Sequence, residues 1–112
     1  MPESLLTTTT LSVEGYRITE YKGLVRGIVV RSPTISQGLL GGLKQLVGGQ
    51  ISAYAEMCEQ ARGQAYDLLL RHARELGADA VVGIRYESSE VGRQGSATEV
   101  LCYGTAVKLQ RA

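Results

Sequence analysis

Three side chains in this 112-residue sequence could act as soft or imidazole metal ligands: Cys58, His72 and Cys102. Thiolate sulfur and imidazole nitrogen are the donors that zinc and soft heavy metals prefer. No paired-cysteine or paired-histidine spacing accompanies them. Cys58 and His72 fall on one predicted helix, about 21 Å apart along its axis, so they cannot share an ion within one subunit. Cys58 and Cys102 could meet if the strand carrying Cys102 packs beneath that helix, which makes them the candidate metal ligands; alternatively, both are small core residues with free thiols.

Residues typical of catalysis are few. The single histidine, His72, lies beside the apolar stripe of a helix, where imidazole is more often a packing residue than a base. No Gly-x-Ser-x-Gly elbow occurs. Asp79 stands at a helix-to-strand corner, and its short side chain already suits it to forming the turn. We therefore predict no catalytic residue, and the sequence leaves enzymatic activity uncertain while favouring its absence.

A glycine-rich stretch ending near Lys44 resembles a phosphate-binding loop only superficially. A Walker loop needs Gly-Lys followed by Ser or Thr, so that the amine and the hydroxyl reach phosphate and magnesium. Gly42-Leu43-Lys44-Gln45 has neither the adjacent pair nor the hydroxyl. The spacing therefore excludes a nucleotide site of this type.

Composition predicts one globular domain over residues 1–112, with 1–6 as a flexible start. Hydrophobic residues make up 44% and charged residues 21%, which is ordinary for a folded domain. A net charge of +1 argues against nucleic-acid and membrane partners. Two cysteines make no disulfide framework, and no apolar run or basic leader suggests a membrane span or export signal. We expect a cytoplasmic protein with free thiols.

The first third of the chain predicts β-structure followed by a short helix. Thr7–Thr10 are β-favouring and read as a short strand or arm, either an ordered terminus or an edge strand added to another subunit. Arg17–Arg31 has β-branched residues on both sides of Lys22-Gly23, which predicts a β-hairpin. After Ser32-Pro33, apolar residues recur at helical spacing over 35–47 until Gly48-Gly49 ends the pattern.

The remaining chain predicts a long helix and a second hairpin. Ser52 is the expected N-cap of a helix over 53–76, whose apolar stripe includes Met57, Cys58 and Ala61. Gly77 and Asp79 form a sharp corner into a strand over 80–87, and a second strand covers 98–109. The fold class is thus α+β, with a small antiparallel sheet made of an N-terminal and a C-terminal hairpin packed against one short and one long helix.

The two C-terminal strands are apolar or small on both faces. By simple alternation, one face of the first strand carries Val82, Ile84 and Tyr86, and the other carries Val81, Gly83 and Arg85. In the second strand, one face begins with Leu101 and the other with Val100. A sheet in a lone small subunit usually shows a polar outer face, so another chain is expected to cover the second one. Symmetry can then turn ordinary residues into a ring-shaped site. The candidate binding residues are Tyr54, Glu56, Arg62 and Asp79, although the first three also fit exposed helix pairs and a packed Tyr.

The chain resembles the YbjQ-like family of uncharacterised bacterial proteins, described as carrying a “putative heavy-metal-binding” domain. The resemblance extends from Thr7 to Lys108 and rests on several segments taken together. These are Glu14-Gly15, the Tyr21-x-Gly23-x-Val25-x-Gly27 stretch, Val47-Gly48-Gly49 with Tyr54, Ala61-Arg62 with Ala65, Leu76 through Gly83, and Gly104-Thr105-Ala106-Val107.

The resemblance implies a dodecin-like α+β subunit assembled as a homopentamer or a pair of pentamers. Cys58, His72 and Cys102 do not fall on the matching positions, so the resemblance lends them no support as metal ligands. We expect a homo-oligomeric, non-enzymatic protein with a composite binding site at subunit interfaces. The alternatives are a protein that binds a divalent or soft heavy-metal ion, and a flavin-type small-ligand carrier or undetected enzyme, the flavin resting on the dodecin analogy alone.

Overall fold

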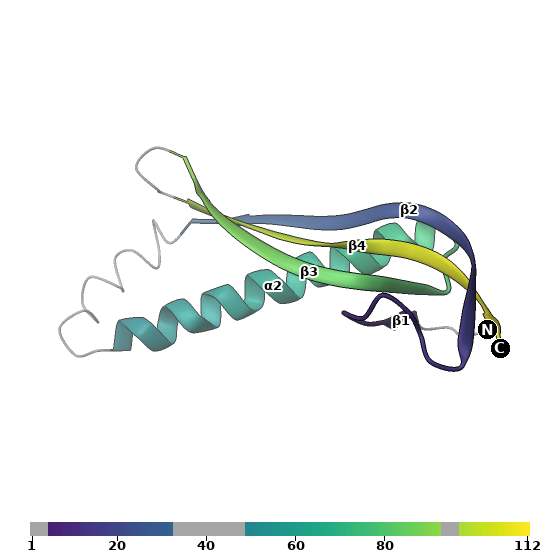
Figure 1. Ribbon diagram of the computed structural model, residues 1–112. Coiled ribbons are helices and arrows are strands. Elements are labelled where there is room, and N and C mark those ends of the chain that lie inside the picture. The colour runs from purple at the N-terminus through teal and green to yellow at the C-terminus, as the bar shows by residue number, and fades with distance from the viewer. Residues whose placement is uncertain (1–4, 33–48, 93–96) are drawn as a thin grey trace.

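The computed structural model describes residues 5–32, 49–92 and 97–112, which form an α+β fold (Figure 1). A mixed sheet in the order β1-β3-β4-β2 packs one face on a long helix, α2. These elements are β1 (Leu6–Thr7), β2 (Tyr16–Arg31), α2 (Gly49–Glu75), β3 (Ala80–Val91) and β4 (Ala97–Arg111). The sheet is mixed rather than antiparallel as expected, because β1 runs parallel to β3 while β2 and β3 both run antiparallel to β4. The predicted short helix over 35–47 lies outside the described residues.

The α2 helix packs on the sheet through four residues at a spacing of four, three of which are alanines. Ala61, Ala65, Leu69 and Ala73 are all buried, and they form the core with sheet residues Val25, Val81, Val100, Cys102 and Ala106. Residues four apart lie on one face of a helix, and alanine allows its backbone to approach the sheet closely. Close approach is greatest at Gly27 of β2, where an added Cβ would collide with Ala65 O and lie 2.8 Å from Leu69 N.

The predicted hairpin over Arg17–Arg31 is wrong. The chain does not reverse at Lys22-Gly23 but continues as one 16-residue strand, β2. Its partner β4 is nearly as long and pairs with it from Tyr16 to Arg31, so the pairing favours an extended chain throughout. Gly23, at φ +120°, sits at a shift in the β2–β4 register, where the glycine bends the strand instead of turning it.

The C-terminal hairpin is confirmed, but its strands are longer than predicted and one of them changes face. β3 continues to Val91 and β4 begins at Ala97, so half of the connection expected over 88–97 is strand. A register shift between Val82 and Arg85 breaks the alternation, with Gly83 at φ +65° inside it. Val82 and Tyr86 therefore lie on opposite faces, contrary to the simple alternation.

The start of α2 also differs from the prediction. The helix begins at Gly49, so Ser52 lies inside its first turn and is not the N-cap. Its end agrees with the prediction to one residue. Gly77 has a φ of +74°, its N–H donates to Arg74 O at 2.9 Å, and Ala78 N–H donates to Ala73 O at 3.1 Å. This pair of bonds is a Schellman motif, which confirms Gly77 as the residue that ends the helix.

The side chain of Asp79 was expected to hydrogen-bond within its own turn, but it bonds to β4 instead. Its carboxylate accepts the Leu109 N–H at 2.8 Å and pairs with Lys108 Nζ at 3.1 Å, while its own N–H donates to Val107 O at 2.8 Å. The Leu109 N–H, aided by Lys108, holds the pKa of the carboxyl below its ordinary value of 3.8, and partial burial opposes the shift. Asp79 therefore joins the helix end to the sheet.

The threonine-rich N-terminal segment lies on the chain's own sheet. After β1, the Thr8 N–H donates to Val81 O at 3.0 Å, and the Gly83 N–H donates to Thr10 O at 2.8 Å. Val13 then packs over Ala80, Val82 and Val107 on the face opposite α2. The segment thus covers β3 as far as Ile84, on one edge and part of one face.

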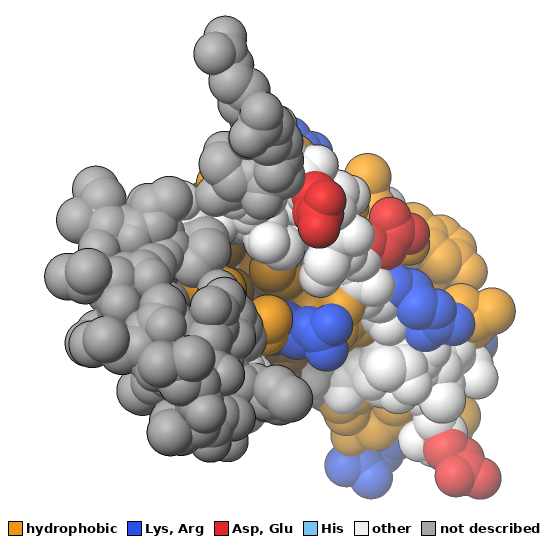
Figure 2. Space-filling view, turned by 90° about the vertical axis from the view of Figure 1, so that its left-hand side faces the viewer, with side chains coloured by type: hydrophobic (Ala, Val, Ile, Leu, Met, Phe, Trp, Pro, Cys, Tyr) orange, Lys and Arg blue, Asp and Glu red, His pale blue; other side chains and the backbone are white. Residues whose placement is uncertain are grey.

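Much of the sheet face opposite α2 is left uncovered, and we call it the open face. Leu24, Ile28 and Val30 of β2 are 61%, 42% and 58% exposed there. Hydrophobic side chains also reach the surface beside charged ones when the molecule is seen from one end (Figure 2). The open face further carries Arg26, Glu87, Leu101 and Tyr103, by their register with these residues. Three exposed aliphatic side chains on one strand are unusual for a face that meets only water.

The contact at Gly27 predicts opposite effects for two glycine-to-alanine changes. Gly27→Ala forces a methyl group into the backbone of α2, so we expect the free energy of unfolding to fall by about 3 kcal/mol. Gly63→Ala on the exposed side of α2 meets nothing within 4 Å and should raise that free energy by about 0.5–1 kcal/mol. Urea denaturation at one protein concentration measures both. A Gly27→Ala protein as stable as the parent would contradict this account of the packing.

The Asp79 contacts predict a pH-dependent contribution to stability. Because the folded-state pKa is lowered, the stabilisation is fully present above pH 3.8 and is lost as the pH falls through the lower folded value. Asp79→Ala should cost about 1–3 kcal/mol at pH 7, and Asp79→Asn less, since the amide oxygen can still accept the Leu109 N–H. Unfolding curves between pH 2 and pH 7 would test this. A constant difference between parent and Asp79→Asn would refute the linkage.

Candidate functional site

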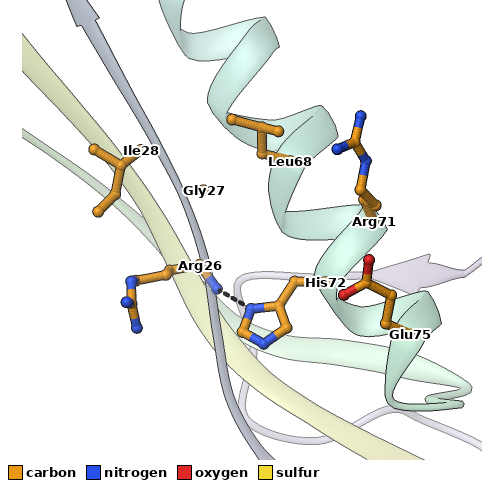
Figure 3. A pocket seen from close by; sticks show the side chains of 7 residues that line it. All are labelled: Arg26, Gly27, Ile28, Leu68, Arg71, His72 and Glu75. Carbon is orange, nitrogen blue, oxygen red and sulfur yellow. Dashed lines mark hydrogen bonds between the residues drawn. The ribbon is translucent and has the colours of Figure 1, made fainter.

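A groove runs between α2 and the outer edge of β2 (Figure 3). One pocket in it has a volume of about 380 Å³ and an adjoining one about 320 Å³, and both are lined by Leu68 and Arg71. The larger also contacts Arg26, Gly27, Ile28, His72 and Glu75, and the smaller contacts Val29, Gln64 and Asp67. Gly27 is the reason that the helix lies close enough to form one wall.

His72 crosses from α2 to the edge of β2. Its Nδ1 accepts the backbone N–H of Arg26 at 3.3 Å, as the dashed line in Figure 3 marks. An accepting Nδ1 carries no proton, so the neutral ring holds its proton on Nε2. His72 thus takes the place that a neighbouring strand's carbonyl would occupy at this position of the edge.

The charges in the groove alternate in sign. Arg71 stands one helical turn from Asp67 and one from Glu75, whereas the guanidinium of Arg26 in β2 points away from the helix (Figure 3). Acidic and basic groups are thus nearly balanced, unlike a site built for a free anion. The described lining contains no hydroxyl or thiol group.

The edge of β2 beside the groove is a template for another strand. Since the Arg26 N–H points away from β4, period-two alternation directs the N–H and C=O groups of Leu24, Ile28 and Val30 outward as well. Among the described residues, no hydrogen bond reaches these outward groups. Long, apolar and unpaired edges are pairing sites unless they are shielded.

The two cysteines are not brought together within one chain. Cys102 is fully buried and pairs in the sheet with Gly27, beneath Ala65 and Leu69, whereas Cys58 is exposed about 10 Å earlier along α2. Burial raises the pKa of the Cys102 thiol, which makes it a poor thiolate ligand at neutral pH. Across the described ranges, no three His, Cys, Asp or Glu side chains gather closely enough to hold a metal ion.

Tyr86 is a neighbour of Cys102 that the sequence did not single out. Burial, and then the adjacent Cys102 thiol, raises the pKa of Tyr86 to about 12. Its ring lies 5.7 Å from the guanidinium carbon of Arg62, a cation–π distance. The predicted binding residue Arg62 is thus held against the sheet by an aromatic face.

The other predicted binding residues do not form one cluster within the chain. Glu56 is exposed on the first half of α2, and Asp79 lies past the other end of that helix, in the corner already described. The side chain of Tyr54 lies outside the described residues. Glu56, Arg62 and Asp79 are spread along more than 20 Å of helix, so one chain does not combine them in a single site.

Sequence reasoning missed the groove and its edge. The position of a glycine inside an apolar strand, at Gly27, signals close approach of another backbone and could have indicated where the helix would cross. His72 gave no comparable signal, because its partner is a backbone group and backbone groups are common to all residues. In the described part of the chain, no helix has both the length and the apolarity required to span a membrane.

Comparisons with known proteins match most of the length of this chain. A family model described as “putative heavy-metal-binding” matches residues 5–110. A UPF0145 protein of Legionella pneumophila is 58% identical over 104 residues, covering 93% of this chain and 97% of that protein. A UPF0145 protein of Francisella tularensis is 55% identical over 100 residues, covering 88% and 94%.

A solved structure supports the architecture alone. The crystal structure of a protein of unknown function from the DUF74 family of Pediococcus pentosaceus aligns with a TM-score of 0.67 at 21% identity, covering 95% of this chain and 98% of that one. The family match and the identities to the bacterial relatives go further than the shared fold. Together with the segments that carry the resemblance, they place this chain in the YbjQ (UPF0145) family.

Proposed function

We propose that the protein is a non-enzymatic homo-oligomer whose binding site is composite and lies at the interfaces between subunits. The observation that carries this proposal is the uncovered apolar surface of β2, where Leu24, Ile28 and Val30 are exposed beside an unpaired strand edge. Burying such a surface against another copy removes apolar area from water and pairs the free backbone groups.

The groove between α2 and β2 becomes a site only when a neighbour closes it. In one chain it is open and nearly balanced in charge, which is a poor arrangement for holding a small ligand. A neighbouring subunit would add a second wall, exclude water and strengthen each electrostatic contact. We extend the proposal to a closed ring, and the resemblance to the YbjQ-like family favours a homopentamer or a pair of pentamers.

Native mass spectrometry of protein purified from cells tests the assembly and its ligand together. We expect a multiple of the 12.0 kDa chain, five or ten copies, with any retained ligand appearing as added mass. A flavin would be released on denaturation as a yellow chromophore. A monomer at micromolar concentration would refute the proposal.

Heavy-metal binding is a second candidate, since the matching family model carries that description. The residues described within one chain do not fit a metal site, because Cys102 is buried and Cys58 stands alone on the surface. A metal would therefore need Cys58 from more than one subunit.

Metal titration distinguishes the two candidates. On the composite-site proposal, Zn²⁺, Cd²⁺ and Cu⁺ bind equally weakly to the parent, to Cys58→Ser and to the Cys58→Ser, Cys102→Ser double variant. Isothermal calorimetry at constant pH measures this. Stoichiometric binding by the parent that Cys58→Ser alone abolishes would favour the metal candidate instead.

A further inference from the structure

Among the described residues, no strand pairs with the outer edge of the far half of β3, which is a second candidate edge for pairing. The N-terminal segment pairs with β3 only as far as Ile84, whose N–H donates to Thr8 O at 3.1 Å. Arg26 and Tyr103 are a non-hydrogen-bonded pair, so the backbone N–H and C=O of Tyr103 point away from β2 and toward β3. Its partner in β3, Arg85, therefore exchanges hydrogen bonds with Tyr103. The N–H and C=O groups of Tyr86, Ser88 and Glu90 therefore point away from β4.

We propose that the β3 edge of one copy, from Arg85 to Val91, adds in parallel to the β2 edge of a second copy, with Glu87 opposite Arg26. This interface presupposes the proposed homo-oligomer, and the two surfaces that meet in it are the β2 edge and the β3 edge. Within one chain β2 and β3 run in the same direction, since both are antiparallel to β4. A β3 strand added in parallel to β2 of another copy therefore has the same orientation as the β3 of that copy.

This register satisfies the hydrogen-bond geometry of a parallel pair. A residue that faces the neighbouring strand bonds to the two residues flanking its partner there. With Arg26 opposite Glu87, Ile28 stands opposite Ser89, and the flanking Ser88 and Glu90 are two of the residues whose backbone groups point outward. Val30 likewise meets Glu90 and Gly92. Shifting the strand by a single residue would point these groups away from each other.

Charge selects this register among those that the backbone allows. Residues directly opposite in a parallel pair share a face, and both Arg26 and Glu87 lie on the open face. A shift by two residues toward the start of β3 would instead set Arg26 against Arg85. On the helix face, Glu90 falls diagonally beside Arg31. None of Arg26, Arg31, Glu87 and Glu90 forms an ion pair with another described residue, although the Glu87 carboxylate accepts the Tyr103 hydroxyl at 3.1 Å through one of its oxygens.

The same charges disfavour the symmetric alternatives. Pairing two β2 edges would bring Arg26 and Arg31 of one copy against those of the other, and pairing two β3 edges would oppose Glu87 and Glu90. A β2-to-β3 contact is heterologous, so each copy keeps one free surface of each kind until a ring closes. His72 already occupies the Arg26 N–H, and the incoming strand therefore bonds from the Arg26 C=O onward and closes the groove beside Arg71.

A charge exchange tests the pairing. Arg26→Glu and Glu87→Arg each set like charges against one another in every interface, and each should weaken association about tenfold or more. The double variant restores an opposite pair in every interface and should recover the parent's mass. Arg74→Glu, on an exposed part of α2 outside the groove, is the matched control and should leave the mass unchanged.

Masses come from multi-angle light scattering and native mass spectrometry, with circular dichroism to confirm folding. If a reversed variant is unfolded, Arg26→Gln and Glu87→Gln replace it, and each should still weaken association. Hydrogen exchange adds a backbone measurement, since the amides of Ile28 and Val30 should be protected in the parent assembly and exchange fast in Arg26→Glu. A parent monomer would overturn the proposed function itself. An oligomeric parent with unaffected single variants, or with no recovery in the double variant, would overturn this interface alone.

Discussion

The contact between the α2 backbone and Gly27 determines the geometry of the rest of the molecule. A helix lies about 10 Å from a sheet when ordinary side chains separate them, and it approaches closer only where a strand lacks a Cβ. The stripe of Ala61, Ala65 and Ala73 makes the same approach possible from the helix side. Together these small residues place α2 directly over β2, so that the helix covers one face of the edge strand and leaves its outer side as a groove.

The sequence allowed prediction of the elements whose signals are local. Gly77 ends the helix as expected because a positive φ is a property of the residue itself, and the C-terminal hairpin follows from two neighbouring runs of β-favouring residues. The sequence misled where a distant partner decides the outcome. Lys22-Gly23 has the composition of a turn, but β4 pairs along the entire segment and keeps it extended. Gly83 likewise reads as one more small strand residue, and only the pairing with β4 reveals the bulge.

The candidate site was harder to predict, since its principal contacts use backbone atoms. His72 binds an N–H, Asp79 binds an N–H, and the free edges consist of N–H and C=O groups that every residue carries. The expectation that another chain covers the second face came from apolar alternation in the two C-terminal strands. Val13 of the same chain covers part of that face, and the exposed aliphatic residues Leu24, Ile28 and Val30 lie on β2 instead. The soft ligands Cys58 and Cys102 stood out in the sequence because such residues are few, yet the fold separates them.

The strand order has a consequence for how the chain folds. β4 lies between β3 and β2, so the strand that comes after all the others in the chain occupies the interior of the sheet. β2 can pair with nothing until residues some 80 positions later have been made, and its apolar length stays exposed to solvent and to other chains during that interval. Protein synthesis thus leaves a long β-prone segment without its partner while the ribosome completes the chain, a period in which holding chaperones commonly protect such segments.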